Sequence, residues 1–191
     1  MSIKSINPAT GEVIERYEEM PSEEVDSILR QVDETWETWR RTPLEERAAP
    51  MRQAATTLRD RSQEYARLMA QEMGKPLAQG RAEAEKCAWV CDYYADNAAR
   101  FLEPQLVETD ASKSYVAFNP LGIVLAVMPW NFPFWQLFRF AAPALMAGNA
   151  GVLKHASNVP GCALAIEGLL REAGFPENLF RTLLIGSSRV N

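Results

Sequence analysis

The sequence predicts an α/β protein, in which an N-terminal helical segment precedes the first β-α-β-α-β half of a Rossmann-like parallel sheet. Two observations indicate this fold. Residues 21–103 are charged and repeat apolar residues at helical spacing, whereas residues 114–188 are largely apolar and alternate strand-like runs with helix-like ones. Because β-α-β crossovers are right-handed, the strands of the second part should be parallel and carry helices on their faces.

The first 103 residues should form a hairpin and four helices. Turn residues 7–12 separate two short apolar runs and predict a hairpin over residues 3–16. A first helix begins at Ser22, where Glu23 and Glu24 suit the helix dipole. Its apolar face is formed by Val25, Ile28, Leu29, Val32, Trp36 and Trp39.

The next three helices have recognisable ends. Thr42 begins a pattern typical of a capping box, with proline at the first helical position. Pro50 should kink or restart this second helix. The third begins at Ser62 and ends at Gly74, and the fourth continues to about Leu102.

A second hairpin and the sheet should follow. Two short runs, residues 106–108 and 114–118, flank a polar turn and predict the hairpin. The uninterrupted apolar run 123–128 predicts a strand that is covered on both faces. The elements expected after it are a helix over 134–147, a strand over 151–154, a helix over 160–173 and a strand over 180–185.

Composition and charge exclude several classes of protein. Of the 191 residues, 47% are hydrophobic and 24% charged, as in soluble globular proteins. The net charge of −5 argues against a nucleic-acid partner, because such binding needs a surplus of basic residues. Three cysteines and no apolar leader predict a reduced, cytoplasmic protein.

One apolar run is long enough to be considered as a membrane span. Residues 114–138 carry no charge and could cross a bilayer as a helix. Pro120, Pro129 and Pro133 interrupt the run, so that it cannot form one continuous helix. We expect a buried strand and a loop, and no membrane partner.

Ligands of open α/β sheets bind beyond the carboxyl ends of the strands. Three segments should lie there: 129–133, 154–158 and 186–188. A lysine and hydroxyl groups at neighbouring strand ends suit a ribose or a phosphate. The glycine-rich G-x-G-x-x-G fingerprint is absent, which argues against a standard Rossmann phosphate loop.

Five motifs are informative together: Ile6-Asn7-Pro8-Ala9-Thr10-Gly11-Glu12, Glu72-Met73-Gly74-Lys75-Pro76, Met128-Pro129-Trp130-Asn131-Phe132-Pro133, Ala147-Gly148-Asn149 and Val152-Leu153-Lys154. With these motifs, the sequence resembles the aldehyde dehydrogenase superfamily across essentially the whole chain. The stretches 131–136 and 154–160 most resemble bacterial NAD(P)-dependent succinate-semialdehyde dehydrogenases. The resemblance implies oxidation of succinate semialdehyde to succinate, in which a cysteine thiolate adds to the aldehyde and a thiohemiacetal and then a thioester form.

The resemblance assigns Asn131 to the catalytic site. Its side-chain amide would donate a hydrogen bond to the developing oxyanion, and losing such a donor typically costs about 3 kcal/mol in the barrier. The structural alternative is an asparagine that caps the following helix or holds its own loop.

The resemblance also implies a dinucleotide site. Lys154 matches the lysine that binds the adenosine ribose, although a lysine at a strand end is commonly just exposed. Ser157 stands where many NAD-using relatives carry a glutamate that repels a 2′-phosphate. Serine removes this repulsion, so we expect NADP, with NAD possible. The remaining expected cofactor-binding residues are Met128, Pro129, Trp130, Gly186 and Ser187.

Arg139 is the candidate for recognising the substrate's carboxylate. It is the only charged residue between Lys113 and Lys154, and an unpaired charge buried on an apolar helix would be costly. It should therefore pair with a carboxylate, either elsewhere in the fold or on the substrate. Phe132 and Trp135 would line the aldehyde tunnel, with core packing as the alternative.

The three cysteines are expected to be packing residues. Cys87 and Cys91 stand four apart on one helical stripe, but His155 is the only histidine, so a zinc site is improbable and no metal is expected. None of the three cysteines, Cys162 included, matches the nucleophile of the resembling family.

Much of the family's chain is missing from these residues. The general base, the nucleophile and most of the catalytic domain would lie beyond Asn191, so the chain alone should be inactive. The expected division is 1–105 for the hairpin and helices of the cofactor domain, 106–120 for an oligomerisation hairpin and 121–191 for the first half of the NAD(P)-binding sheet. Two alternatives are a non-catalytic module that binds a dinucleotide or forms a homo-oligomer, and a dehydrogenase for another aldehyde.

Overall fold

The N-terminal half contains a hairpin and four helices, as predicted. A computed structural model describes residues 2–190. Strands β1 (Ser2–Ile6) and β2 (Val13–Glu18) pair antiparallel. The helices that follow are α1 (Ser22–Trp39), α2 (Leu44–Asp60), α3 (Ser62–Met73) and α4 (Leu77–Phe101).

The C-terminal half is a parallel three-stranded sheet, which confirms the predicted fold class. Strands β5 (Ile123–Met128), β6 (Ala150–His155) and β7 (Phe180–Thr182) lie in the order β5-β6-β7. Helix α5 (Pro133–Met146) connects the first pair, and α6 (Pro160–Glu172) connects the second. A short 3₁₀ turn, η1 (Ser187–Arg189), follows β7.

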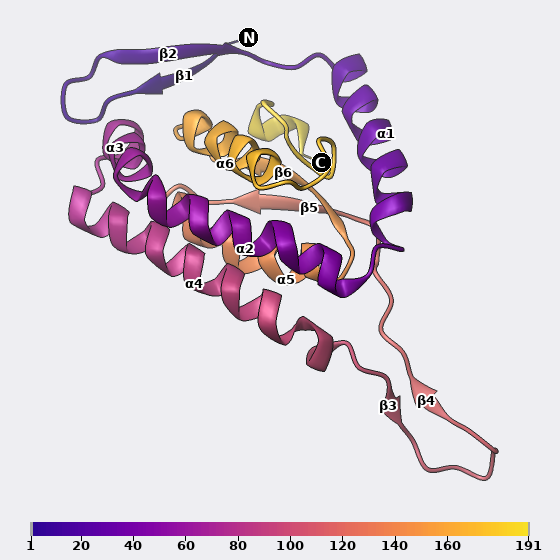
Figure 1. The fold of residues 1–191 in the computed structure, drawn as a ribbon. Helices are drawn as coiled ribbons and strands as arrows, with labels where there is room; N and C mark the ends of the chain where they lie inside the picture. The colour runs from indigo at the N-terminus through magenta and orange to yellow at the C-terminus, as the bar shows by residue number, and fades with distance from the viewer. Residues whose placement is uncertain (1, 191) are drawn as a thin grey trace.

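The second predicted hairpin is present but short. Strand β3 (Gln105–Leu106) pairs antiparallel with β4 (Tyr115–Val116), and the hairpin extends away from the body of the molecule (Figure 1). Leu106 is 78% exposed and Tyr115 is 54% exposed, so the arm presents apolar side chains to solvent.

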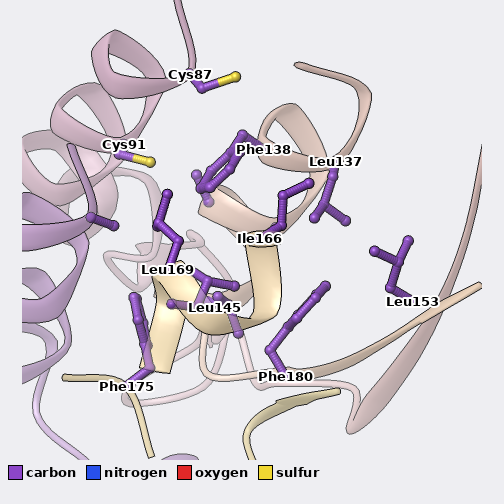
Figure 2. Packing of buried hydrophobic residues seen from close by; sticks show 14 of the residues in the cluster. Cys87, Cys91, Leu137, Phe138, Leu145, Leu153, Ile166, Leu169, Phe175 and Phe180 are labelled. Carbon is purple, nitrogen blue, oxygen red and sulfur yellow. The ribbon is translucent and has the colours of Figure 1, made fainter. Parts of the chain in front are cut away.

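One hydrophobic core joins the helical half to the sheet. Cys87 and Cys91 of α4 approach Phe138 of α5 and the side chains of α6 (Figure 2). The Tyr65 ring of α3 packs at an incline against the Phe134 ring of α5, with ring centroids 4.9 Å apart. The helical segment therefore packs directly on the crossover helices that cover the sheet.

The predicted start of α2 is wrong in detail. The helix begins at Leu44 with Pro43 as its N-cap, and no side chain caps it. The Thr42 hydroxyl instead donates to the Thr38 carbonyl of the preceding helix, 3.3 Å away. Pro50 does not restart the helix: α2 is continuous from Leu44 to Asp60 and contains Pro50.

Two predictions for the sheet also need correction. Strand β5 is not covered on both faces, since Leu125 is 49% exposed and Val127 55% exposed. Both lie on the face opposite Ala126, which is buried. Strand β7 ends at Thr182 rather than at residue 185, although the Leu183 amide still donates to the Leu153 carbonyl.

The apolar run 114–138 divides into β4, β5 and the start of α5, as expected from its prolines. Within residues 2–190, no helix combines the length and the apolar character needed to cross a membrane.

Helices α3 and α4 approach each other closely at Gly80. A methyl group added there would lie 2.8 Å from the Ala66 Cα, so Gly80→Ala should lower the free energy of unfolding by about 1–3 kcal/mol. Gly168 of α6 is the matched control, because nothing lies within 4 Å of its would-be methyl group. Gly168→Ala should leave stability unchanged or raise it by up to about 1 kcal/mol. Urea unfolding measures both, and equal effects would contradict the close approach.

Candidate functional site

Asn131 lies exposed in the loop between β5 and α5, at the carboxyl end of the sheet. Its side chain makes no hydrogen bond with any residue from 2 to 190, and no side chain of the N-cap residue caps α5. The alternative reading of Asn131 as a cap of α5 therefore finds no support in the described contacts. The amide remains available to a ligand.

A remote carboxylate caps α5 instead. The Glu83 side chain of α4 accepts hydrogen bonds from the amides of Phe134 and Trp135, at 2.9 and 3.0 Å. Its second oxygen forms a buried ion pair with Lys75. The Lys75 ammonium also lies 4.0 Å from the centre of the Phe132 ring, so this pair holds both the helix start and the loop before it.

His155, the last residue of β6, connects the end of this strand to the start of α5. Its Nδ1 accepts a hydrogen bond from the Ala156 amide, so Nε2 carries the proton and donates to the Pro133 carbonyl, 3.0 Å away. His155 is 5% exposed. Burial lowers the pKa of its imidazole below the ordinary value, so the ring is neutral at pH 7 and keeps this arrangement.

Helix α6 is capped in the same manner. Glu72, at the end of α3, accepts from the amides of Gly161 and Cys162 at 2.9 and 2.8 Å, and the Ser5 hydroxyl donates to it. The first amides of α5 and α6, which could bind a phosphate, are thus already paired with carboxylates. A dinucleotide's pyrophosphate would have to bind elsewhere.

Lys154 points into a groove of about 440 Å³ on the face of the sheet. The groove lies between the strands, α1 and η1, and Leu125 lines it beside Lys154. Lys154 is 5% exposed, and burial lowers the pKa of its ammonium. It takes part in none of the ion pairs or side-chain hydrogen bonds found between residues 2 and 190, so this cation fits a hydroxyl-bearing or anionic ligand.

The other expected cofactor-binding residues lie at or after the carboxyl ends of the strands of the sheet. Ser157 is exposed in the loop after β6, and Gly186 and Ser187 follow β7. Trp130 is 50% exposed in the loop after β5, which begins with Pro129 directly after Met128. These residues thus follow the carboxyl ends of β5, β6 and β7, at one edge of the sheet.

Phe132 and Trp135 line a second groove, of about 320 Å³, between α4 and α5. Phe132 is 47% exposed, so it is not a core residue. The Lys86 ammonium lies 4.0 Å from the centre of the Trp135 ring and lines the same groove. We call this space the α4–α5 groove.

Comparison with known proteins decides the family. Residues 1–190 match the model of the aldehyde dehydrogenase family. The chain belongs to this family.

Two similar relatives carry a narrower description. A probable NADP(+) succinate-semialdehyde dehydrogenase from Synechocystis is 54% identical over 186 residues, covering 97% of this chain and 41% of the relative. Succinate-semialdehyde dehydrogenase [NADP(+)] 1 of Mycobacterium tuberculosis is 46% identical, covering all of this chain and 42% of the relative. The chain thus spans about two fifths of the length of these relatives.

A solved structure supports the same fold. The succinic semialdehyde dehydrogenase of Streptococcus pyogenes, crystallised with NADP+, superposes with a TM-score of 0.95 and is 37% identical. The match covers 98% of this chain and 42% of that one. The helical segment and the three-stranded sheet are therefore an N-terminal part of the aldehyde dehydrogenase fold.

The expected burial of Arg139 is wrong. Its side chain is exposed on α5 and forms none of the ion pairs found among residues 2–190. The apolar character of its neighbours suggested burial, but Arg139 lies one helical turn after Trp135, on the side of α5 that faces outward. It needs no protein partner, because water solvates it.

The three cysteines are all buried and free. Burial raises the pKa of each thiol, which disfavours the nucleophilic thiolate. They are packing residues, as predicted. In the described part of the chain, no group of three or more His, Cys, Asp or Glu side chains is placed to hold a metal ion.

The sequence reasoning missed Glu72, Glu83 and Lys75 as contributors to the site. A signal was present, because Glu83 stands four residues before Cys87 and Glu72 three residues after Met69, on helical faces that are otherwise buried. A charged residue at a position that periodicity predicts to be buried indicates a specific partner. The identity of that partner is not encoded in the spacing.

The neutral state of His155 predicts a pH dependence of stability. Because its folded pKa lies below the ordinary value of 6.5, the unfolded chain binds a proton first as pH falls. The free energy of unfolding should therefore decrease below about pH 6.5, by at most about 1.4 kcal/mol per pH unit for this one group. His155→Gln retains a donor and an acceptor without titrating. Urea unfolding at pH 7.5 and 5.5 should show a smaller loss for this variant, and an equal loss would contradict the assignment.

Proposed function

We propose that the chain is the N-terminal part of an NADP-dependent aldehyde dehydrogenase that oxidises succinate semialdehyde to succinate in the cytoplasm. The family itself is established by the match over residues 1–190. The substrate and cofactor are our proposal, supported by the names of the relatives and by the residues at the sheet edge. We retain the expected division into residues 1–105, 106–120 and 121–191.

The unpartnered amide of Asn131 is the observation that carries the catalytic assignment. When a thiolate adds to the aldehyde, the carbonyl oxygen becomes an oxyanion. A donor that is already fixed in place stabilises this charge without reorganising. Asn131 offers such a donor next to a helix start that Glu83 holds. The thiolate must come from another segment, because Cys87, Cys91 and Cys162 are buried, so we propose that these 191 residues alone do not turn over.

Lys154 and Ser157 support the cofactor proposal. The buried ammonium of Lys154 would bind the ribose hydroxyls, and the exposed Ser157 leaves room for a 2′-phosphate without a repelling carboxylate. Bound nicotinamide would accept the hydride from the aldehyde carbon. The same site would accept NAD with fewer contacts.

Arg139 supports the substrate proposal. An exposed guanidinium without an ion pair, one turn beyond the α4–α5 groove, can bind the distal carboxylate of a four-carbon semialdehyde. Phe132 and Trp135 would contact its methylene groups. The exposed β3–β4 arm supports assembly of the protein into a homo-oligomer.

Arg139→Ala in the full-length protein tests the substrate. Losing a charge-assisted hydrogen bond of about 1.5–3 kcal/mol should raise KM for succinate semialdehyde by about 10- to 100-fold. KM for butanal, which has the same chain length and no carboxylate, should change less than about twofold. Steady-state kinetics with NADP measure both.

Arg30 of α1 provides the matched control, because it too is exposed and makes no ion pair in the described chain. Arg30→Ala should leave both KM values unchanged. An equal rise of KM for the two aldehydes in Arg139→Ala would instead favour a dehydrogenase for another aldehyde.

Ser157→Glu tests the cofactor. The new carboxylate would repel the 2′-phosphate of NADP but could accept hydrogen bonds from the ribose hydroxyls of NAD. The ratio of kcat/KM for NADP to that for NAD should fall by at least about tenfold. Ser157→Gln adds nearly the same volume without charge and should shift the ratio far less. A ratio that responds equally to both variants would count against the placement of the 2′-phosphate at Ser157.

A further inference from the structure

The start of α5 is capped by a side chain that lies far away in the sequence. Most helices are capped by a polar side chain at the N-cap, but the N-cap of α5 is Phe132 and it provides no such bond. Glu83, 51 residues away from Phe134 in the sequence, accepts from the first amides of the helix. Glu83 is 4% exposed, so water does not compete for these bonds.

Lys75 forms a buried ion pair with this capping carboxylate. Its ammonium is 5% exposed and pairs with the Glu83 oxygen Oε2, while Oε1 accepts from both amides. Removing two charges from water costs several kcal/mol, and replacing such a pair by apolar residues is often neutral or stabilising. Stability alone is therefore a poor explanation for placing an ion pair here.

The pair contacts residues that directly follow Asn131 in the loop and in the first turn of α5. Lys75 lies 4.0 Å from the centre of the Phe132 ring, and Phe134, fully buried, donates its amide to Glu83. The Asn131 side chain makes none of the hydrogen bonds found between residues 2 and 190, so the position of its amide depends on where its backbone lies. That backbone is set by Phe132 and by the first turn of α5.

We propose that Glu83 and Lys75 are positioning residues that aim the Asn131 amide at the oxyanion of the reacting aldehyde. The inference rests on the proposed function, because it needs Asn131 to be the oxyanion donor. A donor displaced by about 1 Å can lose about a hundredfold in rate, so a rigid anchor below this loop has a direct kinetic consequence.

Glu72 provides an internal comparison. It caps α6 with the same chemistry, through two amides and with a short buried side chain as a further partner. The loop before α6 carries no residue assigned to the oxyanion. If Glu83 serves only stability, the loss of kcat on replacing it should be independent of Asn131, as we expect for Glu72. If Glu83 also positions Asn131, that loss should depend on Asn131.

Glu83→Gln in the full-length enzyme tests the proposal. Glutamine cannot accept from both amides and from the ammonium at once, because its amide nitrogen is a donor. We expect kcat for succinate semialdehyde to fall by about tenfold or more, with KM for the aldehyde and for NADP changed less than about twofold. In an Asn131→Ala background, Glu83→Gln should cause almost no further loss of kcat, because the donor that it positions is already absent.

Glu72→Gln is the matched control, and any effect that it has on kcat should multiply with that of Asn131→Ala. If Glu83→Gln lowers the yield of folded protein, as judged by thermal unfolding, Lys75→Gln is used instead. It leaves the helix cap in place, removes the partner that orients it, and should show the same dependence on Asn131.

Two results would overturn the inference in distinguishable ways. If Asn131→Ala lowers kcat but the loss caused by Glu83→Gln or Lys75→Gln multiplies with it, the pair is structural only and the proposed function stands. If Asn131→Ala leaves kcat unchanged, the proposed oxyanion role fails and the positioning role fails with it.

Discussion

Charges from the helical half hold both ends of α5, and the candidate site depends on this constraint. Glu83 accepts from the first amides of the helix, and Arg47 of α2 donates to the Met146 carbonyl at its last turn, 3.0 Å away. Both contacts are favourable, because a carboxylate lies next to the partial positive charge at the helix N-terminus and a guanidinium next to the partial negative charge at its C-terminus. Because α5 also packs on the sheet, these contacts fix where the loop at the end of β5 lies.

The same arrangement explains how the site differs from a standard dinucleotide fold. In such folds the first crossover helix points its amides at a phosphate. Here Glu83 and Glu72 already occupy the starts of α5 and α6, which agrees with the missing glycine-rich fingerprint. What remains open at the carboxyl edge is the buried ammonium of Lys154, the amide of Asn131 and the groove beside Trp135.

Most of the fold could be predicted from local patterns. Helical periodicity and turn residues predicted α1, α3, α4 and the sheet to within a few residues, because these signals act within one or two turns of chain. The residues expected at the strand ends do meet at one edge, because parallel strands align their carboxyl ends. Burial was less predictable: Arg139 and Leu125 are exposed although their neighbours in sequence are apolar.

The sequence by itself determined the order of elements, the parallel sheet and the family, because these follow from short-range spacing and from motifs that can be read without a structure. Only the tertiary structure decided which carboxylate caps which helix, that His155 bonds to the Pro133 carbonyl, and that Asn131 is left without a partner. These contacts join residues 22 to 90 positions apart. Periodicity carries no information on such pairings, because they arise only when elements distant in the sequence pack against one another.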